Sequence, residues 1–409
     1  MKTILNIAFI ILLITISLSC STDRKVNSPE KLKFITGQYD NILAASNSLS
    51  LFPRTIDKKG NLTSTDIYDW TSGFFAGNLW YIYELTGDNK WKNEAIRWTE
   101  ALDTIQYWSG NHDVGFMMNC SYGNGLRLAG KEEYKKVIVQ TAESLCKRYN
   151  PVAKSIKSWN YRKAWNDTTE WFYPVIIDNM MNLELLFKAT QFSGNKKYED
   201  IAIQHALTTM KNHYRPDFSC YHVVDYDTIT GNVLDKATCQ GFTDESSWAR
   251  GQAWGLYGFV LCYRYTKDLK FLSFAENIAR YILHNQNMPE DGVPYWDYSA
   301  GDTTLKPEWK YDPERFRVIP RDASAAAITS SALFELSTYS KEYGTEFKNE
   351  ALKILRSLTS PAYMGVPGDK YFILNHCVGS IPHGVEIDVP LVYADYYLLE
   401  AELRYKGLK

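Results

Sequence analysis

Two aspartates stand where a carboxyl group could move protons. Asp178 follows the apolar run 174–177 and precedes an apolar helical face, and Asp113 lies between His112 and the segment 114–116. Two carboxyl groups that face one cavity can share a proton, so that one acts as an acid and the other stabilises positive charge. On this interpretation we expect the charge of Asp113 to raise the pKa of Asp178. The alternative interpretation gives each residue only a local structural role: Asp178 would be a helix N-cap and Asp113 a turn residue.

A third segment has side chains suited to a sugar ring. Trp248, Arg250 and Trp254 flank the turn 251–253 into a predicted helix. The two indoles can bracket a ring, and the guanidinium can bind an anionic or hydroxyl-rich ligand. Gly251 leaves room for a close approach of backbone. The alternative is a pair of core tryptophans with a surface arginine.

Histidine and cysteine spacing argues against a metal site. The 7 histidines are scattered, and none of the 6 cysteines after Cys20 forms a Cys-x-x-Cys pair. Metal sites bring such ligands together at characteristic spacings. We expect no metal and no cofactor, and buried free thiols, with one disulfide as the alternative in an oxidising compartment.

The elements that must position these residues form a repeated helical unit. In each repeat an amphipathic stretch ends in a short polar turn, an aromatic residue follows, and a second amphipathic stretch begins. Apolar residues recur at the helical period, and the turns carry Gly, Asn, Asp or Lys, as antiparallel helix pairs require. The turns of the five hairpins are Gly87-Asp88, Gly130, Gly194-Asn195, Lys267-Asp268 and Gly344-Thr345.

A sixth hairpin can be assembled from the two ends of the chain, from residues 395–405 and 35–46. Six hairpins that close on themselves predict an all-α fold, an (α/α)6 toroid in one catalytic domain over 35–409. An open helical solenoid is the alternative. Long inserts join successive hairpins and are expected to form the loops of the active-site cleft. These inserts, expected to be non-helical, are 107–121, 150–177, 216–248, 285–320 and 359–392.

Residues 1–20 are typical of a lipoprotein signal peptide. Lys2 provides a positive start, an apolar run covers 4–16, and Cys20 follows small residues. Lipidation of Cys20 would anchor an exported protein in the periplasm or at the cell surface, with residues 21–34 as a flexible tether. Plain secretion with a free Cys20 is the alternative. Membrane contact is expected only through this lipid, because no other segment approaches the length of a membrane-spanning helix.

Composition narrows the choice of partners. The net charge of −2 gives no basic field for nucleic acid, and 29 Tyr and 12 Trp make the chain rich in aromatic residues. Most of these rings are expected in the core, and a minority can form platforms for sugars.

Taken together, these motifs resemble glycoside hydrolase family 88, the unsaturated glucuronyl hydrolases. The resemblance covers about residues 35–405, in the order of the family, and its strongest motif is Trp-Ala-Arg-Gly-Gln-Ala-Trp-Gly-Leu-Tyr at 248–257. Related unsaturated rhamnogalacturonyl hydrolases typically have Arg-Gly-Asn-Gly-Trp at the position of 250–254, so the glucuronyl family is favoured. The other matching motifs are Gln240-Gly241, His112–Phe116, the helix start at Asp178 and Ala394–Tyr397.

The resemblance implies a substrate and a set of roles. The substrate would be an oligosaccharide that a polysaccharide lyase leaves from a glycosaminoglycan or similar acidic polysaccharide, with a 4,5-unsaturated uronic acid at its non-reducing end. Asp178 would be the general acid and base, Asp113 its essential partner, and Trp70 a ring-stacking residue. The binding positions around the uronate would be His112, Gln240, Trp248, Arg250 and Trp254.

The chemistry fits two carboxyl groups without a cofactor. The C4=C5 bond is a vinyl ether, so protonation at C4 creates a cation at C5, water adds there, and the hemiketal opens to release the next sugar. Two departures from the family are Cys239, where relatives often have His, and the loop 380–384, which lacks the Lys that holds a sulfate in some relatives.

Two other functions stay open. One is rhamnogalacturonyl-type specificity on the same scaffold. The other is a carbohydrate-binding lipoprotein that has lost catalysis, which would keep the aromatic residues without needing both Asp113 and Asp178.

Overall fold

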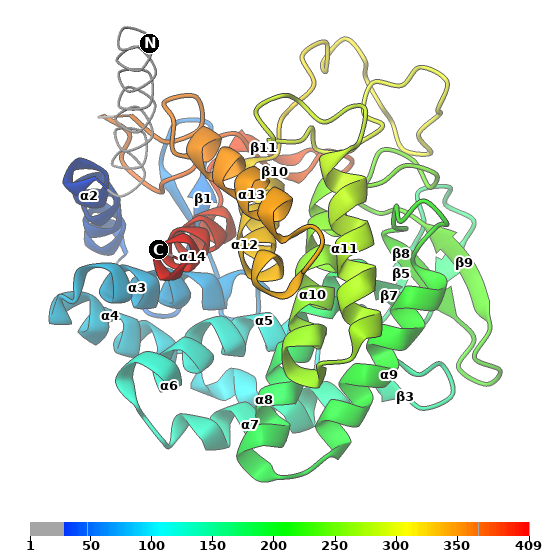
Figure 1. Ribbon diagram of the computed structural model, residues 1–409, viewed down its shortest axis with the longest axis horizontal. Helices are drawn as coiled ribbons and strands as arrows, with labels where there is room; N and C mark the ends of the chain where they lie inside the picture. The colour runs from blue at the N-terminus through cyan, green and yellow to red at the C-terminus, as the bar shows by residue number, and fades with distance from the viewer. Residues whose placement is uncertain (1–27, 47, 367, 409) are drawn as a thin grey trace, which may run out of the picture.

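A computed structural model describes residues 28–46, 48–366 and 368–408 (Figure 1). The predicted signal peptide, the lipidation of Cys20 and the tether up to residue 27 lie outside the described residues. The described chain is mostly helical. The α-helices are α2 (Pro29–Ala45), α3 (Ser72–Thr86), α4 (Asn89–Glu100), α5 (Val114–Met118), α6 (Asn124–Ala129), α7 (Tyr134–Cys146), α8 (Leu183–Ser193), α9 (Lys197–Asn212), α10 (Ala249–Thr266), α11 (Leu269–Leu283), α12 (Ala323–Tyr339), α13 (Gly344–Leu358) and α14 (Val392–Gly407).

The five predicted hairpins are α3–α4, α6–α7, α8–α9, α10–α11 and α12–α13. Their turns have a local cause. Gly87 and Lys267 end their helices in the left-handed conformation, with φ of 71° and 56°. Asp88 and Asp268 then cap the next helices by accepting the N–H of Lys90 and Lys270.

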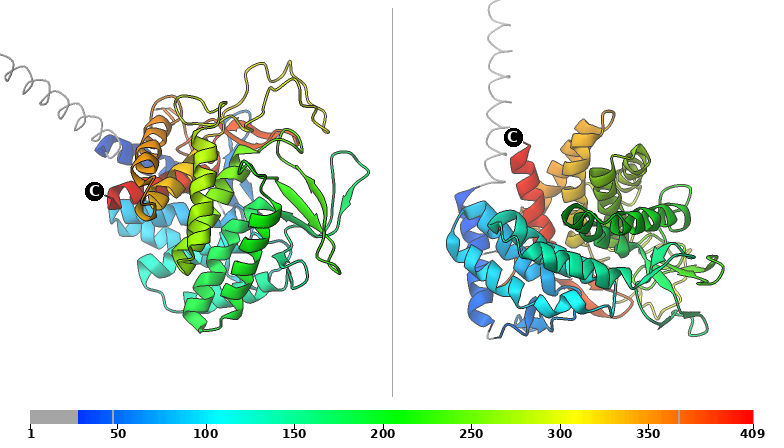
Figure 2. Two further views of the ribbon diagram at one scale, coloured as in Figure 1. Left: turned by 45° about the vertical axis from the view of Figure 1, so that its right-hand side comes forward. Right: turned by 90° about the horizontal axis from the view of Figure 1, so that it is seen from below.

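Six helices, referred to below as the inner helices, form a closed ring: α3, α5, α8, α10, α12 and α14. Helix α3 contacts α5 and α6, α5 contacts α8, α8 contacts α10, α10 contacts α12, and α12 contacts α14. Helix α14 also contacts α3, so the last hairpin returns to the first, as the right-hand view of Figure 2 shows. The predicted partner of α14 is α2, and Tyr39 of α2 donates a hydrogen bond to Asp395 of α14 at 2.9 Å.

Helix α2 begins earlier than expected. Ser28 is its N-cap, because Oγ of Ser28 accepts the N–H of Lys31 at 3.2 Å, and Pro29 occupies the first helical position. The tether predicted over 21–34 is therefore wrong for 29–34, which belong to the helical domain. The polar composition of the segment concealed a regular helix start.

The second hairpin also starts earlier than expected. Residues 107–121, predicted as a non-helical insert, contain α5 and the beginning of the π-helical segment η2 (Asn119–Gly123), which leads into α6. Gly115 and Gly123 lower the helix propensity of this stretch, and packing inside the ring overrides it.

Three of the other inserts, 150–177, 216–248 and 359–392, carry short antiparallel strands rather than only loops, whereas 285–320 has only isolated β-bridges. The all-α description therefore holds for the scaffold alone. Two 3-10 segments, η1 (Asp103–Tyr107) and η3 (Ile177–Asn182), complete the connections. Most of the strands lie at the top and right of Figure 1. The strands are β1 (Phe52–Ile56), β2 (Leu62–Thr65), β3 (Tyr149–Asn150), β4 (Ser155–Ile156), β5 (Arg162–Lys163), β6 (Glu170–Trp171), β7 (Pro174–Ile176), β8 (Val223–Tyr226), β9 (Val233–Ala237), β10 (Cys377–Ser380) and β11 (Val385–Val389).

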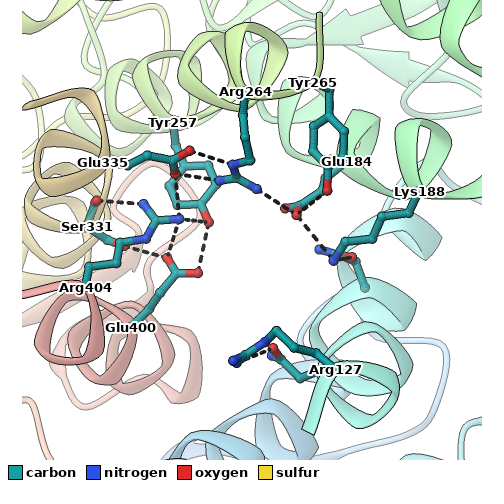
Figure 3. A network of polar contacts seen from close by, with 12 residues as sticks. Arg127, Glu184, Lys188, Tyr257, Arg264, Tyr265, Ser331, Glu335, Glu400 and Arg404 are labelled. Carbon is teal, nitrogen blue, oxygen red and sulfur yellow. Dashed lines mark hydrogen bonds and ion pairs between the residues drawn. The ribbon is translucent and has the colours of Figure 1, made fainter. Parts of the chain in front are cut away.

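Ion pairs join the C-terminal parts of α10, α12 and α14 to one another and to the first turn of α8 (Figure 3). Arg264 of α10 makes two hydrogen bonds to Glu335 of α12, at 2.5 and 2.6 Å, and a third to Glu184 of α8 at 2.8 Å. Arg404 of α14 pairs with the same Glu335 at 2.9 Å and with Glu400 at 3.6 Å. The network ties four of the inner helices around a cavity of about 430 Å³.

Candidate active site

The predicted site residues gather at the opposite, N-terminal end of the inner helices. Trp70 precedes α3, Asp113 precedes α5, Asp178 lies in η3 just before α8, and Arg250 lies in the first turn of α10. The N-terminal ends of helices carry partial positive charge and free N–H groups. This end of the ring therefore favours an anionic ligand.

Close backbone packing places the two aspartates near each other. A Cβ on Gly115 would lie 2.5 Å from Oδ1 of Asn182, and a Cβ on Gly258 would lie 2.4 Å from Cβ of Met180. Segment η3 therefore packs directly against both α5 and α10. Asn182 also accepts the N–H of Phe116 at 2.7 Å, which fixes η3 to the helix that follows Asp113.

Asp178 does not act as the helix cap that its local alternative required, whereas Asp113 lies in a turn, as its local alternative predicted. Asp113 occupies the N-cap position of α5 but makes no capping hydrogen bond with its side chain. The N-cap of η3 is Ile176, and within the described chain Oδ2 of Asp178 is buried without a hydrogen-bond partner. Both carboxyl groups are thus available to a ligand.

Each carboxyl group has a buried neutral histidine beside it. Nε2 of His112 lies 3.3 Å from Oδ1 of Asp113, and Nε2 of His222 lies 3.8 Å from Oδ2 of Asp178. Burial lowers the pKa of His112 to about 3 and the pKa of His222 well below its usual value, so both rings are uncharged.

Hydrogen bonds select the tautomer of both histidines. Nδ1 of His222 accepts the backbone N–H groups of Cys239 and Gln240, at 2.9 and 3.1 Å. Nδ1 of His112 lies 3.3 Å from Nδ2 of Asn182, an amide whose Oδ1 already accepts a backbone N–H. In each ring the proton is therefore on Nε2, the nitrogen nearer the carboxyl group.

Burial raises the pKa of both carboxyl groups. The pKa of Asp178 rises to about 7, against the opposing effects of Arg250 and the indole of Trp254. Burial, followed by the charge of Asp178, raises the pKa of Asp113 to about 8. The expectation that the charge of Asp113 raises the pKa of Asp178 is wrong. Because Arg250 favours the ionised form of Asp178, this group ionises first, and its charge then keeps the proton on Asp113.

A pocket of about 240 Å³ brings three of the predicted binding residues together: Trp70, Gln240 and Arg250. Tyr393, at the start of α14, also lines it, with its ring centroid 4.8 Å from that of Trp70. Trp70 is half-buried, so one part of its ring is available to a sugar.

The tryptophans of the third segment do not bracket an open slot. Trp254 is fully buried and packs against Phe116 and Tyr397, with centroid distances of 5.2 and 5.3 Å. Trp248 is also buried, and the guanidinium of Arg250 lies 4.4 Å from its ring centroid. Bracketing of a sugar by the two indoles is therefore wrong for this structure, and the indole of Trp254 instead lies close to Asp178, whose pKa it lowers.

Arg250 is buried rather than on the surface. Its guanidinium donates to the carbonyls of Val378 and Gly379 and lies 3.3 Å from Asp322, the N-cap of α12. These contacts hold β10 against the inner ring and leave Nε without a partner among the described residues.

Two of the residues that line the pocket, Arg250 and Tyr393, have a buried polar atom without a hydrogen-bond partner among the described residues, and so do several residues that pack close to them. Buried polar groups in native proteins are nearly always hydrogen-bonded, so a cluster of exceptions points to a missing ligand. Among the described residues, such atoms in this region include Oδ2 of Asp178, Nε2 of His112 and His222, Nε1 of Trp248, Nε of Arg250 and the hydroxyl of Tyr393, and others, such as those of Asn78 and Glu94, lie elsewhere in the molecule.

The described residues contain no group of three or more His, Cys, Asp or Glu side chains arranged to hold a metal ion. The cysteines in the same part of the chain are free thiols. No helix in it has the length and apolar character needed to cross a membrane.

Comparison with known proteins places the chain in a family. The family model described as Glycosyl Hydrolase Family 88 matches residues 51–265. An unsaturated glucuronyl hydrolase of Formosa agariphila is 43% identical over 426 aligned positions, which cover 100% of this chain and 99% of that relative. The chain belongs to glycoside hydrolase family 88. It is therefore similar along its whole length to enzymes that cleave glycosides.

Solved structures of family 88 have the same fold. An unsaturated glucuronyl hydrolase specific for heparin matches with a TM-score of 0.84 and 44% identity, over 93% of this chain and 98% of that one. The enzyme of a Bacillus species, responsible for the degradation of glycosaminoglycan, matches with a TM-score of 0.80 and 30% identity, over 92% of this chain and 96% of that one. A third structure is a variant of the Streptococcus agalactiae enzyme in which an aspartate is replaced by asparagine, complexed with dGlcA-GalNAc6S. It matches with a TM-score of 0.73 and 27% identity over 94% of both chains.

Three residues at the family 88 site were not identified from the sequence. His222 lies in the predicted insert 216–248, but an isolated histidine has no spacing signal. Tyr393 directly precedes the matching motif at 394–397, which was the available clue. Asn182 is inside the apolar segment after Asp178, and only its contacts with His112 and Phe116 reveal its role.

Proposed function

We propose that this family 88 member hydrates the C4=C5 bond of an unsaturated uronic acid at the non-reducing end of lyase-generated glycosaminoglycan oligosaccharides. Full-length similarity to unsaturated glucuronyl hydrolases supports the reaction. The observation that carries the proposal is the pair Asp113 and Asp178, whose side chains are only 13% and 14% exposed at the N-terminal end of the inner ring and whose pKa values are both near neutrality. A proton donor works best when its pKa is close to the working pH.

In this mechanism Asp178 is the general acid and base. Below a pH of about 7 it is protonated and can transfer its proton to C4, which leaves positive charge at C5. Asp178 then carries a negative charge beside that cation, while Asp113 keeps its proton. The Asp178 carboxylate accepts a proton from the water that attacks C5, and the hemiketal opens to release the aglycone.

The aromatic and cationic residues would hold the uronate in place. Trp70 and Tyr393 offer faces for the ring, and the unpartnered Nε of Arg250 and the indole N–H of Trp248 can donate to its carboxylate or hydroxyl groups. The partial positive charge at the helix N-termini supports the binding of the carboxylate.

The test is turnover of lyase-generated disaccharides from chondroitin, hyaluronan, heparin and ulvan, followed by the loss of absorbance of the unsaturated bond. Asp178→Asn should reduce kcat by about 10²–10⁴-fold or more, because it keeps the shape of the side chain and removes its proton. Near wild-type activity of this variant would show that Asp178 is not the acid.

We further infer that the ring of helices is an (α/α)6 toroid whose inserts form the active-site cleft. The closed order of contacts among the inner helices and the position of the pocket at their N-terminal ends support this description. An open solenoid would leave α14 and α3 apart.

Export as a lipoprotein anchored through Cys20 is part of the proposal. The apolar run over 4–16 and the cysteine after small residues support it. Placement in the periplasm or at the cell surface would give the enzyme access to the products of an extracellular lyase.

A further inference from the structure

A second arginine faces the same pocket as Arg250. Arg162 of strand β5 lines the pocket together with Trp159, Gln240 and His383. The other arginines that line the pocket are neutralised by carboxylates. Arg250 pairs with Asp322. Arg54 pairs with Asp69 and with Glu386, which lie on separate segments of the chain. Arg162 has no carboxylate partner within the described residues.

The guanidinium of Arg162 is held in place by neutral groups. It lies 4.9 Å from the ring centroid of Trp159 and donates to Nε2 of His383. Because Nε2 accepts this bond, the proton of His383 is on Nδ1, which lies 2.6 Å from Oγ of Ser380. The positive charge of Arg162 is therefore positioned but not compensated.

An aromatic row joins the two arginines. The ring centroid of Trp159 lies 6.0 Å from that of His222, and His222 lies 4.8 Å from Trp248. Arg162 stands over the Trp159 end of the row and Arg250 over the Trp248 end. The site therefore presents two cations along one line of rings.

The two ends of the row differ in depth. Arg250 is 2% exposed and is close enough to lower the pKa of Asp178, so it belongs to the end where the uronate reacts. Arg162 is only half-buried and lies beside the exposed His383 and Val385 at the mouth of the pocket. A non-reducing uronate at the deep end directs the rest of the oligosaccharide toward this mouth.

We propose that Arg162 binds an anionic substituent on the sugar adjoining the uronate. The inference rests on the proposed function. In a glycosaminoglycan disaccharide the adjoining sugar is an amino sugar, whose anionic substituents are sulfate groups. The planar guanidinium can bind two sulfate oxygens at once, which gives specificity as well as affinity.

The experiment compares unsaturated disaccharides that differ only in one sulfate on the amino sugar, either 6-O-sulfate or N-sulfate, with the unsulfated form. For each protein the readout is the ratio of kcat/KM for the sulfated to the unsulfated substrate. The wild type should prefer one of the sulfated disaccharides. Arg162→Gln should lower that ratio about tenfold, mainly through KM of the sulfated substrate.

Two further variants separate binding from folding. Arg162→Lys keeps the charge without the planar fork and should retain part of the preference. Lys163→Gln removes an exposed positive charge from the same strand and should leave the ratio unchanged. Added salt should reduce the ratio of the wild type more than that of Arg162→Gln.

The outcomes distinguish the two proposals. If Arg162→Gln slows both substrates equally, or if the wild type shows no preference for either sulfated form, the role of Arg162 is overturned and the proposed reaction stands. A wild-type protein that turns over none of the disaccharides overturns both.

Discussion

Nε2 of His222 lies 3.8 Å from Oδ2 of Asp178, and Nδ1 of the same ring accepts two backbone N–H groups. The ring is neutral, so its single proton is on the side of the aspartate. An N–H group beside a carboxyl favours its ionised form. His222 is thus placed to stabilise the carboxylate that Asp178 becomes after it has donated its proton.

Replacement of this histidine should change the pH dependence of the reaction. His222→Phe removes the N–H, so the pKa of Asp178 should rise, the alkaline limb of the kcat/KM profile should move to higher pH, and kcat should fall about tenfold. His205→Phe is the matched control, because His205 is equally buried and accepts the N–H of Ile156 at 3.0 Å. An identical profile for both variants would contradict a role for His222 beside Asp178.

The alkaline limb should report Asp178 itself. Because Asp178 must be protonated to act as an acid, kcat/KM should decrease as the pH rises through about 7. Burial is the main cause of this pKa, so Asp113→Asn should lower the rate but leave the limb in place. A pH–rate profile of both proteins on one disaccharide tests this. A shift of the limb to lower pH by about one unit or more would instead identify the charge of Asp113 as the cause.

The same pKa values predict a gain of stability from removal of a catalytic group. The native state holds protons on Asp113 and Asp178 up to pH values at which the unfolded chain has lost them. The two carboxyl groups contribute fully to the stability of the folded state below a pH of about 4, and this contribution is lost as the pH rises toward 8.

Asp113→Asn should therefore be more stable than the wild type at pH 7.5, with Tm higher by on the order of 2 °C. At a pH of about 4 the difference should vanish, since both proteins are then uncharged at this position. Thermal unfolding at the two pH values measures it. A variant that is less stable at both would show that Asp113 has a structural role.

The ion pairs at the other end of the ring should contribute to stability. Glu335→Gln leaves Arg264 and Arg404 without their shared carboxylate and should cost about 2 kcal/mol, a figure reduced because both arginines are partly exposed. The surface pair of Lys196 and Glu199 provides a control, because Glu199→Gln should cost less than about 0.5 kcal/mol. Denaturant unfolding measures the loss of unfolding free energy in both variants. Equal losses would mean that Glu335 contributes no more to stability than a surface ion pair.

The contribution of Glu335 to the stability of the folded state should increase with pH, whereas the contribution of the two aspartates decreases with pH. The two arginines keep the pKa of Glu335 at about 2, despite burial. Its stabilising effect is therefore present above the pKa of the unfolded chain, about 4.3, and is lost as the pH falls toward 2.

The anchor can be tested independently of the enzyme activity. Cys20→Ala should move the protein from the membrane fraction to the soluble exported fraction, because it removes the site of lipid attachment. Fractionation of cells followed by detection of the protein measures the change. If the wild type is already soluble after export, Cys20 carries no lipid.

Local sequence was sufficient to locate the five helical hairpins. The hairpins could be located because apolar periodicity and turn chemistry act over a few residues, as at Gly87 and Asp268. The motif around Trp248 and Arg250 indicated the family because it combines several unusual residues in one short segment. Local reasoning failed at Pro29 and in 107–121, where polar residues or glycines masked helices that the ring stabilises.

The properties that make the pocket a site depend on contacts between distant segments. Asp113 and Asp178 act on each other because Gly115 lets α5 approach η3, and their pKa values follow from burial that no local pattern encodes. The placement of His222 beside Asp178 and of Arg162 at the mouth likewise joins separate inserts. Sequence determined which chemical groups the chain carries. Tertiary structure decided which of them meet and how far water is excluded from them, and this exclusion of water sets their charge.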